Sequence, residues 1–429
     1  MRTFRNSIEH LITAELTIPL GSQTFSKSKT QYPVGVSPLY ALRAKGPFLW
    51  DVDNNKYIDL VNALASVTLG YGDKRIAREV SKQLRKGISL SLPTKLESQV
   101  AELLTKLIPS AEMVRFSKNG SDATAAAIRI ARSYTGRDHV LVCGYHGWQD
   151  WYIGSTSRNK GVPSAVSQLT HSFNYNDIDS LIEKLSMLEN KVAAVILEPM
   201  NREFPKDKFL EQVKNLTSKA GAILIFDEII TGFRFSKGGA QSLFNVVPDL
   251  STFGKGIANG FPLSAVVGRK EIMLEMENVF FSGTFGGELL SLTAAKSVLE
   301  RHIEEDICGA LFAKGDLLAQ LTLNAIDDQN LSNVVELSGH PSWKFLTWSP
   351  TNNFSSEEIK TYFMQEIFQQ GVLVLGTHNI SLSHSKRLIA KISSAYSIVF
   401  EKIKKALEND SLRDELKVSP LVPLFKVRQ

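Results

Sequence analysis

A lysine between two glycines is the residue of this chain that is best suited to covalent chemistry. Lys255 lies in the small-residue loop "FGKGIANG". A lysine amine can form an imine with a carbonyl group, and flanking glycines let a flat molecule come close. Asp227 lies 28 residues earlier, at the end of the apolar run "GAILIFDEII". A carboxylate there can cap a helix or face a cationic ring nitrogen. Ile229 would point to the same side as Asp227 if the strand continues.

A second group of candidates lies in "FSKNGSDATAAAIRIAR", where a predicted strand turns into a predicted helix. Asn119, Gly120 and Ser121 occupy this turn. Free N–H groups and the helix dipole make such a turn suitable for a phosphate. The same residues could also serve only as a helix cap, through Ser121 or Asp122.

Aromatic residues form the third group. The segment "CGYHGWQDWY" follows an apolar run and contains Tyr145, His146 and Trp148. Tyr145 or Trp148 could stack on a flat ring, or these aromatic side chains could close the edge of the core.

The elements that must position these residues are predicted by apolar runs and helical spacing. "DHVLVCG", "KVAAVILEPM" and "GAILIFDEII" are typical of parallel strands buried on both faces. "RIAREVSKQLRKG", "KLESQVAELLTKLI" and "FLEQVKNLTSKAG" have helical periodicity. The pattern predicts an α/β fold with its functional groups at the carboxyl ends of the strands. "PFLWDVDNNKYIDL" predicts a β-hairpin, and "SSAYSIVFEKIKKALEND" predicts a final helix.

The length of 429 residues is sufficient for more than one domain. We expect an N-terminal arm and hairpin over residues 1–65, a large domain over 66–300, and a small C-terminal domain over 301–429.

Composition excludes several function classes. The net charge of +5 is spread along the chain without a compact basic block, which argues against nucleic-acid binding. The apolar runs are too short to cross a bilayer, so no membrane partner is expected. Cys143 and Cys308 lack metal-ligand spacing and fit a reduced, cytoplasmic protein without a bound metal.

Together and in this order, these motifs resemble the class III aminotransferases, which are pyridoxal-phosphate enzymes of fold type I. The segment "FDEIITGFRFSKGGAQSLFNVVPDLSTFGKGIANGFPLSAVVG" carries the resemblance, which spans roughly Pro38–Leu299 with a looser match to about residue 405. "YHGWQD" and "FRFSKGGAQ" are similar to the glutamate-1-semialdehyde 2,1-aminomutase branch. The resemblance implies a mostly parallel, seven-stranded sheet flanked by helices. It also implies a smaller α+β domain that is formed by the N-terminal arm and the C-terminal part.

The resemblance assigns roles at matching positions. Lys255 would hold pyridoxal 5'-phosphate as an internal aldimine, and Asp227 would pair with the pyridine nitrogen. Ile229 would pack under the ring and Tyr145 on its other face. His146 is expected among the cofactor-binding residues.

The resemblance also assigns the residues that would bind the phosphate of the cofactor. Gly120 and Ser121 match the family's phosphate-binding pair, with Asn119 in place of the usual serine. Thr284 in "FSGTFGG" would reach the phosphate of the other subunit, which implies a homodimer. Glu198 matches an acidic position at the sheet end, where its role can be structural.

The implied reaction transfers an amino group from an amino-acid donor to a small carbonyl substrate. In the aminomutase, an arginine within an N-terminal "SPVRAF"-like stretch holds the substrate carboxylate. Here "VGVSPLYALRAKG" has Leu39 and Tyr40 after Ser-Pro, and Arg43 belongs to the following strand pattern. This departure favours an aminotransferase, with the aminomutase as the alternative.

The C-terminal part offers no arginine at the position that is typical of α-carboxylate binding. Instead "GVLVLGTHNISLSH" contains His378, Asn379 and His384, which could hydrogen-bond the hydroxyls of a keto or aldehydo sugar derivative or could be solvated loop residues. A catalytically silent binding protein, a decarboxylase and a racemase of the same fold stay open as alternatives.

Overall fold

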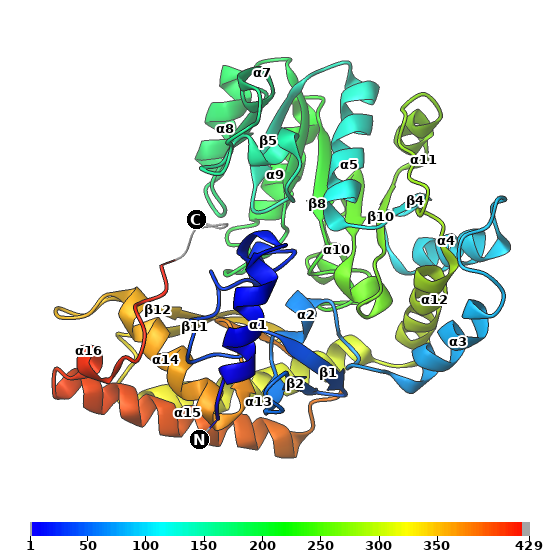
Figure 1. Ribbon diagram of the computed structural model, residues 1–429. Coiled ribbons are helices and arrows are strands. Elements are labelled where there is room, and N and C mark those ends of the chain that lie inside the picture. The colour runs from blue at the N-terminus through cyan, green and yellow to red at the C-terminus, as the bar shows by residue number, and fades with distance from the viewer. Residues whose placement is uncertain (1, 423–429) are drawn as a thin grey trace. The chain divides into compact units, whose positions relative to one another are not determined.

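The computed structural model describes residues 2–422, which divide into two compact units (Figure 1). Within the described residues, the larger unit consists of residues 74–309, and the smaller unit combines residues 2–73 with 310–422. The predicted boundaries at residues 65 and 300 stay predictions, and the predicted domain ends Met1 and 423–429 lie outside the described residues. All ten predicted site residues belong to the larger unit.

A seven-stranded sheet with the order β4-β10-β9-β8-β7-β5-β6 forms the centre of the larger unit. Only β10 runs antiparallel to its neighbours, so the prediction of a mostly parallel sheet is confirmed. The strands are β4 (Met113–Ser117), β5 (His139–Cys143), β6 (Thr170–Ser172), β7 (Val192–Leu197), β8 (Ile223–Asp227), β9 (Leu250–Phe253) and β10 (Ser264–Gly268).

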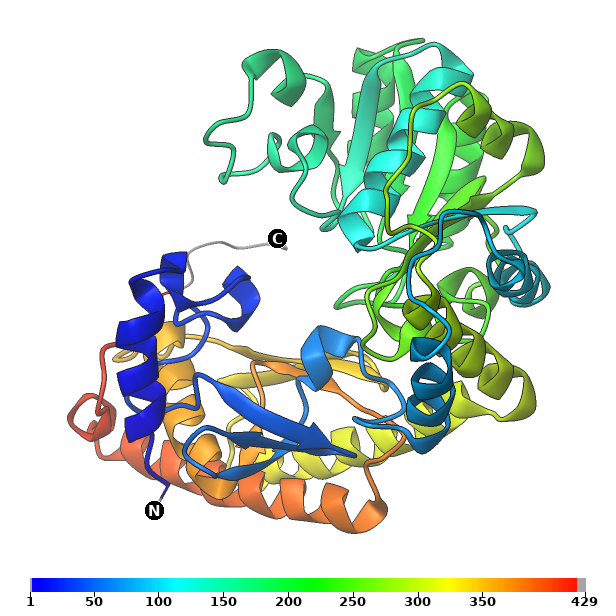
Figure 2. The same cartoon turned by 45° about the vertical axis from the view of Figure 1, so that its right-hand side comes forward.

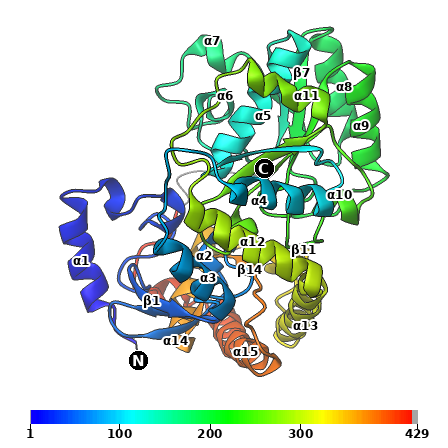
Figure 3. The same ribbon diagram turned by 90° about the vertical axis from the view of Figure 1, so that its right-hand side faces the viewer.

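Helices cover both faces of this sheet, with α5 on one side and α8 and α9 on the other (Figure 3). Alternate side chains of the strands feed two separate cores, because successive residues of a strand point to opposite faces. The helices of this unit are α3 (Lys74–Leu84), α4 (Lys95–Leu107), α5 (Gly120–Thr135), α6 (Asp150–Ile153), α7 (Ser164–Ser167), α8 (Ile178–Met187), α9 (Phe209–Lys219), α10 (Ala240–Leu243), α11 (Lys270–Met273) and α12 (Leu289–Glu304), with 3-10 turns η3 (Lys255–Ala258) and η4 (Leu274–Glu277).

The smaller unit joins the N-terminal and C-terminal parts of the chain in one shared sheet, β1-β2-β3-β13. The predicted hairpin is present as β2 (Phe48–Asp51) paired with β3 (Lys56–Asp59), and β3 also pairs with β13 (Val372–Leu373) from the C-terminal part (Figure 2). The other elements are α1 (Arg5–Glu15), η1 (Pro19–Gly21), η2 (Phe25–Lys27), β1 (Ala41–Lys45), α13 (Ile307–Asp327), β11 (Val335–His340), β12 (Trp343–Trp348), α14 (Ser356–Gln370), β14 (Thr377–Asn379), α15 (Lys386–Glu408) and α16 (Leu412–Glu415).

A left-handed turn in the smaller unit, α2 (Asn62–Ala65), is not predicted by the sequence pattern. All four of its residues have φ between 44° and 69°, a conformation that costs about 1–2 kcal/mol per non-glycine residue. The carboxylate of Asp59 accepts hydrogen bonds from the N–H groups of Val61 (2.7 Å) and Asn62 (3.0 Å). The Asn379 amide donates to Val61 O at 2.9 Å. These bonds offset part of the strain and hold the turn.

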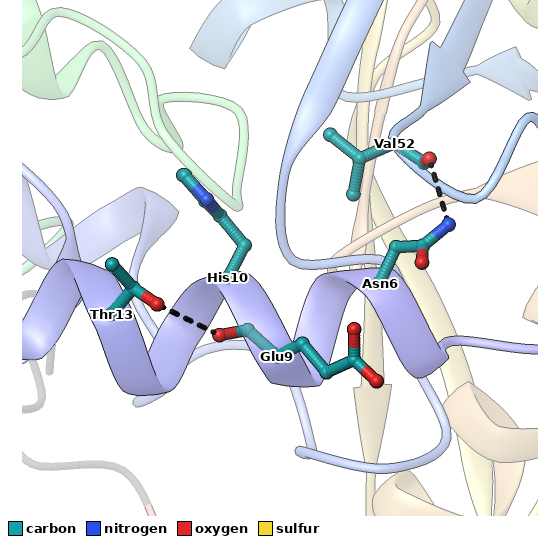
Figure 4. A pocket seen from close by; sticks show the side chains of 5 residues that line it. All are labelled: Asn6, Glu9, His10, Thr13 and Val52. Carbon is teal, nitrogen blue, oxygen red and sulfur yellow. Dashed lines mark hydrogen bonds between the residues drawn. The ribbon is translucent and has the colours of Figure 1, made fainter.

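Helix α1 and Val52 line a pocket of about 360 Å³ in the smaller unit (Figure 4). Its wall is braced by hydrogen bonds from Asn6 Nδ2 to Val52 O (3.3 Å) and from Thr13 Oγ1 to Glu9 O (3.3 Å). The pocket contains none of the predicted site residues. In the described chain, no helix is long and apolar enough to cross a membrane.

Candidate active site

Asp227 ends β8 as a buried carboxylate with three hydrogen-bond partners. Its Oδ2 lies 2.8 Å from Nδ1 of His146, and its Oδ1 accepts from the N–H of Ile229 (3.1 Å) and the hydroxyl of Thr252 (3.4 Å). Only 4% of Asp227 is exposed. None of these partners is a lysine or an arginine. A buried carboxylate with these three partners in the described chain is suited to a positively charged ligand atom.

Lys255 begins the 3-10 turn η3 directly after β9. Its φ is +42°, a left-handed conformation that is uncommon for lysine and that costs roughly 1–3 kcal/mol. Strain of this kind persists only where the surroundings fix the backbone, and it clusters at functional sites. β9 and β10 pair on either side of this connection, so both of its ends are held by the sheet.

Ile229 does not continue the strand of Asp227, so the condition under which the two side chains were expected to share a face is not met. β8 ends at Asp227, because the Asp227 carboxylate binds the N–H of Ile229 and turns the chain. The side chain of Ile229 nevertheless contacts two other parts of the candidate site. A Cβ on Gly120 would lie 3.0 Å from its Cδ1, and a Cβ on Gly254 would lie 3.2 Å from the same atom. Ile229 therefore packs between the start of α5 and the lysine loop.

The predicted phosphate-binding turn is the N-terminus of α5. Asn119 is the N-cap, and a capping box joins it to Asp122, whose Oδ2 accepts from Asn119 N at 2.8 Å. Gly120 and Ser121 are the first two helical residues, and their N–H groups precede the first intrahelical hydrogen bonds to Asn119 O. Such N–H groups at the positive end of a 16-residue helix are suited to an anion.

Tyr145 and His146 lie in the loop after β5. The carboxylate of Glu198, which follows β7, accepts the N–H of Tyr145 at 3.1 Å and the amide of Asn201 at 2.9 Å. Glu198 is buried, so its observed contacts hold the aromatic loop in place. His146 is buried with its main-chain oxygen bonded to Thr124 Oγ1 of α5 at 2.7 Å.

Two predicted positions are exposed. Trp148 lies at the surface, which leaves Tyr145 as the half-buried aromatic side chain of this loop. Thr284 is also exposed and forms no hydrogen bond with the other predicted site residues in the described chain. Its neighbours Phe280 and Phe285 are exposed to 81% and 59%.

His378, Asn379 and His384 do not form a polar lining exposed to solvent. His378 Nε2 bonds the Tyr396 hydroxyl at 2.7 Å, and His384 Nδ1 bonds Ser381 Oγ at 2.8 Å. Burial lowers the pKa of His378 to about 3 and that of His384 to about 4. All three side chains are buried in the smaller unit, so the interpretation as solvated loop residues is wrong, while binding of substrate hydroxyls stays a prediction.

Sequence reasoning missed Thr252 and the link from His146 to Asp227. Thr252 pairs directly with Asp227 in the register of β8 and β9, so alignment of these two strands could have found it. No sequence signal connects His146 with Asp227, since the two residues are 81 positions apart and meet only through the strand order.

The site fits a flat cationic ring that carries a phosphate. The close packing around Gly120 and Gly254 has no room for a methyl group without displacing Ile229. A Cβ on Gly147 would lie 2.6 Å from Ser121 Cβ, so the aromatic loop rests directly on the phosphate-binding turn. The buried carboxylate of Asp227, a lysine loop and a helix N-terminus are together the donor set that pyridoxal phosphate requires.

Comparison with known proteins gives the same answer. The family described as Aminotransferase class-III matches residues 31–407. A glutamate-1-semialdehyde 2,1-aminomutase from Methanothrix thermoacetophila is 33% identical over 426 residues, which cover 91% of this chain and 98% of the relative. A 3-aminobutyryl-CoA aminotransferase from Cloacimonas acidaminovorans is 33% identical over 383 residues, with 87% and 91% covered.

A solved structure shares the fold. The FumI protein of Sphingopyxis sp. MTA144, solved in its PLP internal aldimine form, superposes with a TM-score of 0.87 at 24% identity and covers 96% of this chain and 99% of its own. The chain therefore belongs to the class III aminotransferases, an enzyme family of fold type I whose cofactor is pyridoxal phosphate.

Proposed function

We propose that this enzyme transfers an amino group from an amino-acid donor to a separate small carbonyl compound. The observation that carries the proposal is the engagement of Arg43. Its guanidinium carbon lies 3.7 Å from the centroid of the Trp50 ring, a cation–π contact that fixes the only arginine between Pro33 and Ala44. The arginine clamp that an aminomutase needs for its substrate carboxylate thus has no counterpart in this segment.

The residues of the site divide the chemistry between them. Pyridoxal phosphate, when bound, supplies an electron sink for the carbanion that forms when the substrate loses a proton. Lys255 would hold the cofactor covalently, and its released Nζ would accept and return the proton of the amine-bearing carbon. Asp227 would stabilise the positive charge of the ring nitrogen, and the turn at Gly120 and Ser121 would bind the phosphate.

His146 would act on Asp227 rather than on substrate. Nδ1 of His146 lies 2.8 Å from Oδ2 of this buried carboxylate, which otherwise accepts from one N–H and one hydroxyl. This contact would therefore keep the carboxylate of Asp227 oriented towards the ring nitrogen.

The active unit is proposed to be a homodimer. Ile88, Leu90 and Leu92 are exposed on one segment of the larger unit, and Leu92 is 77% exposed. A hydrogen bond from Leu289 N to Ile88 O at 2.9 Å joins this segment to the start of α12, directly after the segment that carries exposed Phe280 and Phe285. Pairing of these exposed apolar side chains with their copies would close by two-fold symmetry and would bring Thr284 towards the neighbouring site.

The acceptor is proposed only as a small carbonyl compound. The sugar preference was drawn from His378, Asn379 and His384, whose side chains have partners in the interior of the smaller unit. A cytoplasmic location likewise stays a prediction.

An aminomutase is the second candidate, because relatives of that name match almost the whole chain, as the Methanothrix protein does. The two reactions differ in whether amino group and carbonyl belong to one molecule. In an aminotransferase the donor leaves as its carbonyl product before a second compound takes up the amino group, so turnover requires two substrates.

The deciding experiment follows the cofactor absorbance of the loaded enzyme with single amino-acid donors, then with carbonyl acceptors, and identifies products by mass spectrometry. We expect a complete half-reaction with at least one donor and turnover only when an acceptor is present. Conversion of glutamate 1-semialdehyde to 5-aminolevulinate, without turnover on any donor–acceptor pair, would establish the aminomutase instead.

A further inference from the structure

Lys118 joins three segments of the candidate site through one ammonium group. Its Nζ donates to Oε1 of Glu288 at 2.9 Å and to the main-chain oxygen of Pro262 at 3.1 Å. Lys118 itself directly precedes Asn119, the N-cap of the phosphate-binding turn. The pair is largely removed from solvent, since the side chain of Lys118 is 19% exposed and that of Glu288 is 11% exposed.

Glu288 is fixed independently of Lys118. It is the N-cap of α12, where its carboxylate accepts the N–H groups of Leu290 (2.8 Å) and Ser291 (3.0 Å). Burial works to raise the pKa of Glu288, but the hydrogen bonds from Ser291, Lys118 and Leu290 outweigh burial, and the pKa is lowered. The carboxylate therefore stays ionised at neutral pH and keeps its partner.

Pro262 is the residue through which Lys118 contacts the third segment. It lies near the end of the connection that begins with Lys255, two residues before β10. Ser264, the first residue of β10, donates its hydroxyl to Asn119 O at 2.7 Å. Two polar links thus join the phosphate-binding turn to the end of the connection that follows Lys255, one from Lys118 to Pro262 O and one from Ser264 to Asn119 O.

The segment from Phe280 to Glu288 is joined to the rest of the larger unit by surface hydrogen bonds, one of them from Arg129 Nη1 of α5 to Phe280 O at 2.9 Å. Phe280, Thr284 and Phe285 are exposed, and the hydrogen bond from Arg115 Nη2 to Phe281 O (3.1 Å) lies at the surface. Glu288 is the point where this segment meets a largely buried ion pair. Lys118 links the phosphate-binding turn to this segment through Glu288, beside the surface bond from Arg129 of α5 to Phe280 O.

We propose that Lys118 is a positioning residue that couples anion binding at the Gly120–Ser121 turn to the order of residues 280–288. Since this segment carries Thr284 and the apolar side chains of the proposed subunit interface, cofactor binding would also strengthen subunit pairing; this consequence rests on the proposed homodimer. The coupling is reciprocal, so pairing would strengthen anion binding by the same factor.

The test measures hydrogen exchange of peptides that cover residues 280–288 in the cofactor-free protein. The chain is compared alone, with inorganic phosphate, with pyridoxal phosphate and with chloride at equal ionic strength. In the wild type, we expect phosphate and pyridoxal phosphate to slow exchange about fivefold or more, the lower end of usual coupling, while chloride does not. Lys118→Met should abolish this slowing, and Lys118→Arg should restore it.

Two further variants make the result decisive. Lys296→Met removes an exposed lysine from α12 itself and should behave as the wild type does. If Lys118→Met does not fold, Glu288→Gln takes its place, because the amide oxygen can still cap α12 while the negative charge is lost. Undiminished coupling in Lys118→Met, or in Glu288→Gln where that variant is needed, would overturn the proposal, as would no slowing in the wild type.

The same samples separate this inference from the proposed function. Mass spectrometry after borohydride reduction reports whether pyridoxal phosphate is attached to Lys255, and sedimentation reports subunit pairing. Attachment to another residue would contradict the proposed function, while the inorganic phosphate arm would still decide the role of Lys118. Attachment to Lys255 without any change at residues 280–288 would contradict only the role of Lys118.

Discussion

Gly120→Ala tests whether the phosphate-binding turn, the lysine loop and Ile229 form one packed unit. The backbone of Gly120 is helical, so alanine meets no backbone strain there. Its added Cβ would lie 3.0, 3.1 and 3.3 Å from Cδ1, Cγ2 and Cγ1 of Ile229. The side chain of Ile229 would have to move, and it is confined on its other side by Gly254, whose Cβ position lies 3.2 Å from the same Cδ1.

The expected magnitude follows from two opposing effects. Alanine is preferred over glycine in a helix by up to about 1 kcal/mol, whereas overpacking a core typically costs about 1–3 kcal/mol. We therefore expect the free energy of unfolding of the cofactor-free protein to fall by about 0–2 kcal/mol. The displaced Ile229 would press towards the predicted ring position, so the affinity for pyridoxal phosphate should fall about tenfold, equivalent to about 1.4 kcal/mol.

A double-mutant cycle with Ile229→Ala gives the decisive measurement. Ile229→Ala alone should cost about 2–5 kcal/mol, and the double variant should recover at least about 1 kcal/mol relative to the sum, because the new methyl group enters the vacated space. Denaturant unfolding and cofactor titration supply the numbers. Gly136→Ala, at the open end of the same helix, is the control that should add without coupling. Additivity of Gly120→Ala with Ile229→Ala within about 0.3 kcal/mol would refute the packing argument.

Other predictions address single residues. Lys255→Ala should yield no peptide with borohydride-fixed pyridoxal phosphate, and an adduct on another lysine would contradict the assignment. Asp227→Asn should keep cofactor binding but lose roughly 10²-fold or more in kcat, since an amide cannot match a carboxylate at a cationic nitrogen; near-normal turnover would remove Asp227 from its role. His378 and His384 are neutral when folded, with pKa values of about 3 and about 4, but take up protons below about pH 6.5 when unfolded. The free energy of unfolding should therefore fall as pH drops from 6.5 towards 4, by up to about 1.4 kcal/mol per pH unit for each histidine. His378→Gln should reduce this pH dependence in unfolding curves measured at pH 7 and pH 5. An unchanged pH dependence would count against a neutral, buried His378. Phe285→Ser should raise the dimer dissociation constant about tenfold or more in sedimentation without changing the stability of the separated chain, and an unaltered constant would argue against this interface.

The central sheet was predictable because its strands are buried on both faces. β5, β7 and β8 read as continuous apolar runs, and every residue from Val192 to Leu197 is buried in the structure. β9 and β10 are short and contain Ser251, Thr252 and Ser264, so they lack this signal although they carry the connection that holds Lys255. The continuous apolar runs predict buried strands, but they do not predict which strands lie beside β10.

The site was predictable to the extent that it lies at strand and helix ends. Asp227, Lys255 and Gly120 are marked by local sequence, because an acid after an apolar run and glycines at a turn are local features. The contact of His146 with Asp227 depends on the strand order, and the burial of His378 depends on α15, which supplies Tyr396. No local pattern distinguishes an interior histidine from a solvated one.

The antiparallel direction of β10 has a consequence for how this enzyme can change by insertion. Parallel neighbours in the sheet are joined by long crossovers, whose surface loops accept extra residues at little cost. The connection from Phe253 to Ser264 instead joins two adjacent paired strands, and the register Ala265–Phe253 would shift if residues were added near Lys255. We expect length variation to be tolerated in surface loops such as residues 154–163, and to be excluded from the connection between β9 and β10 that presents the lysine.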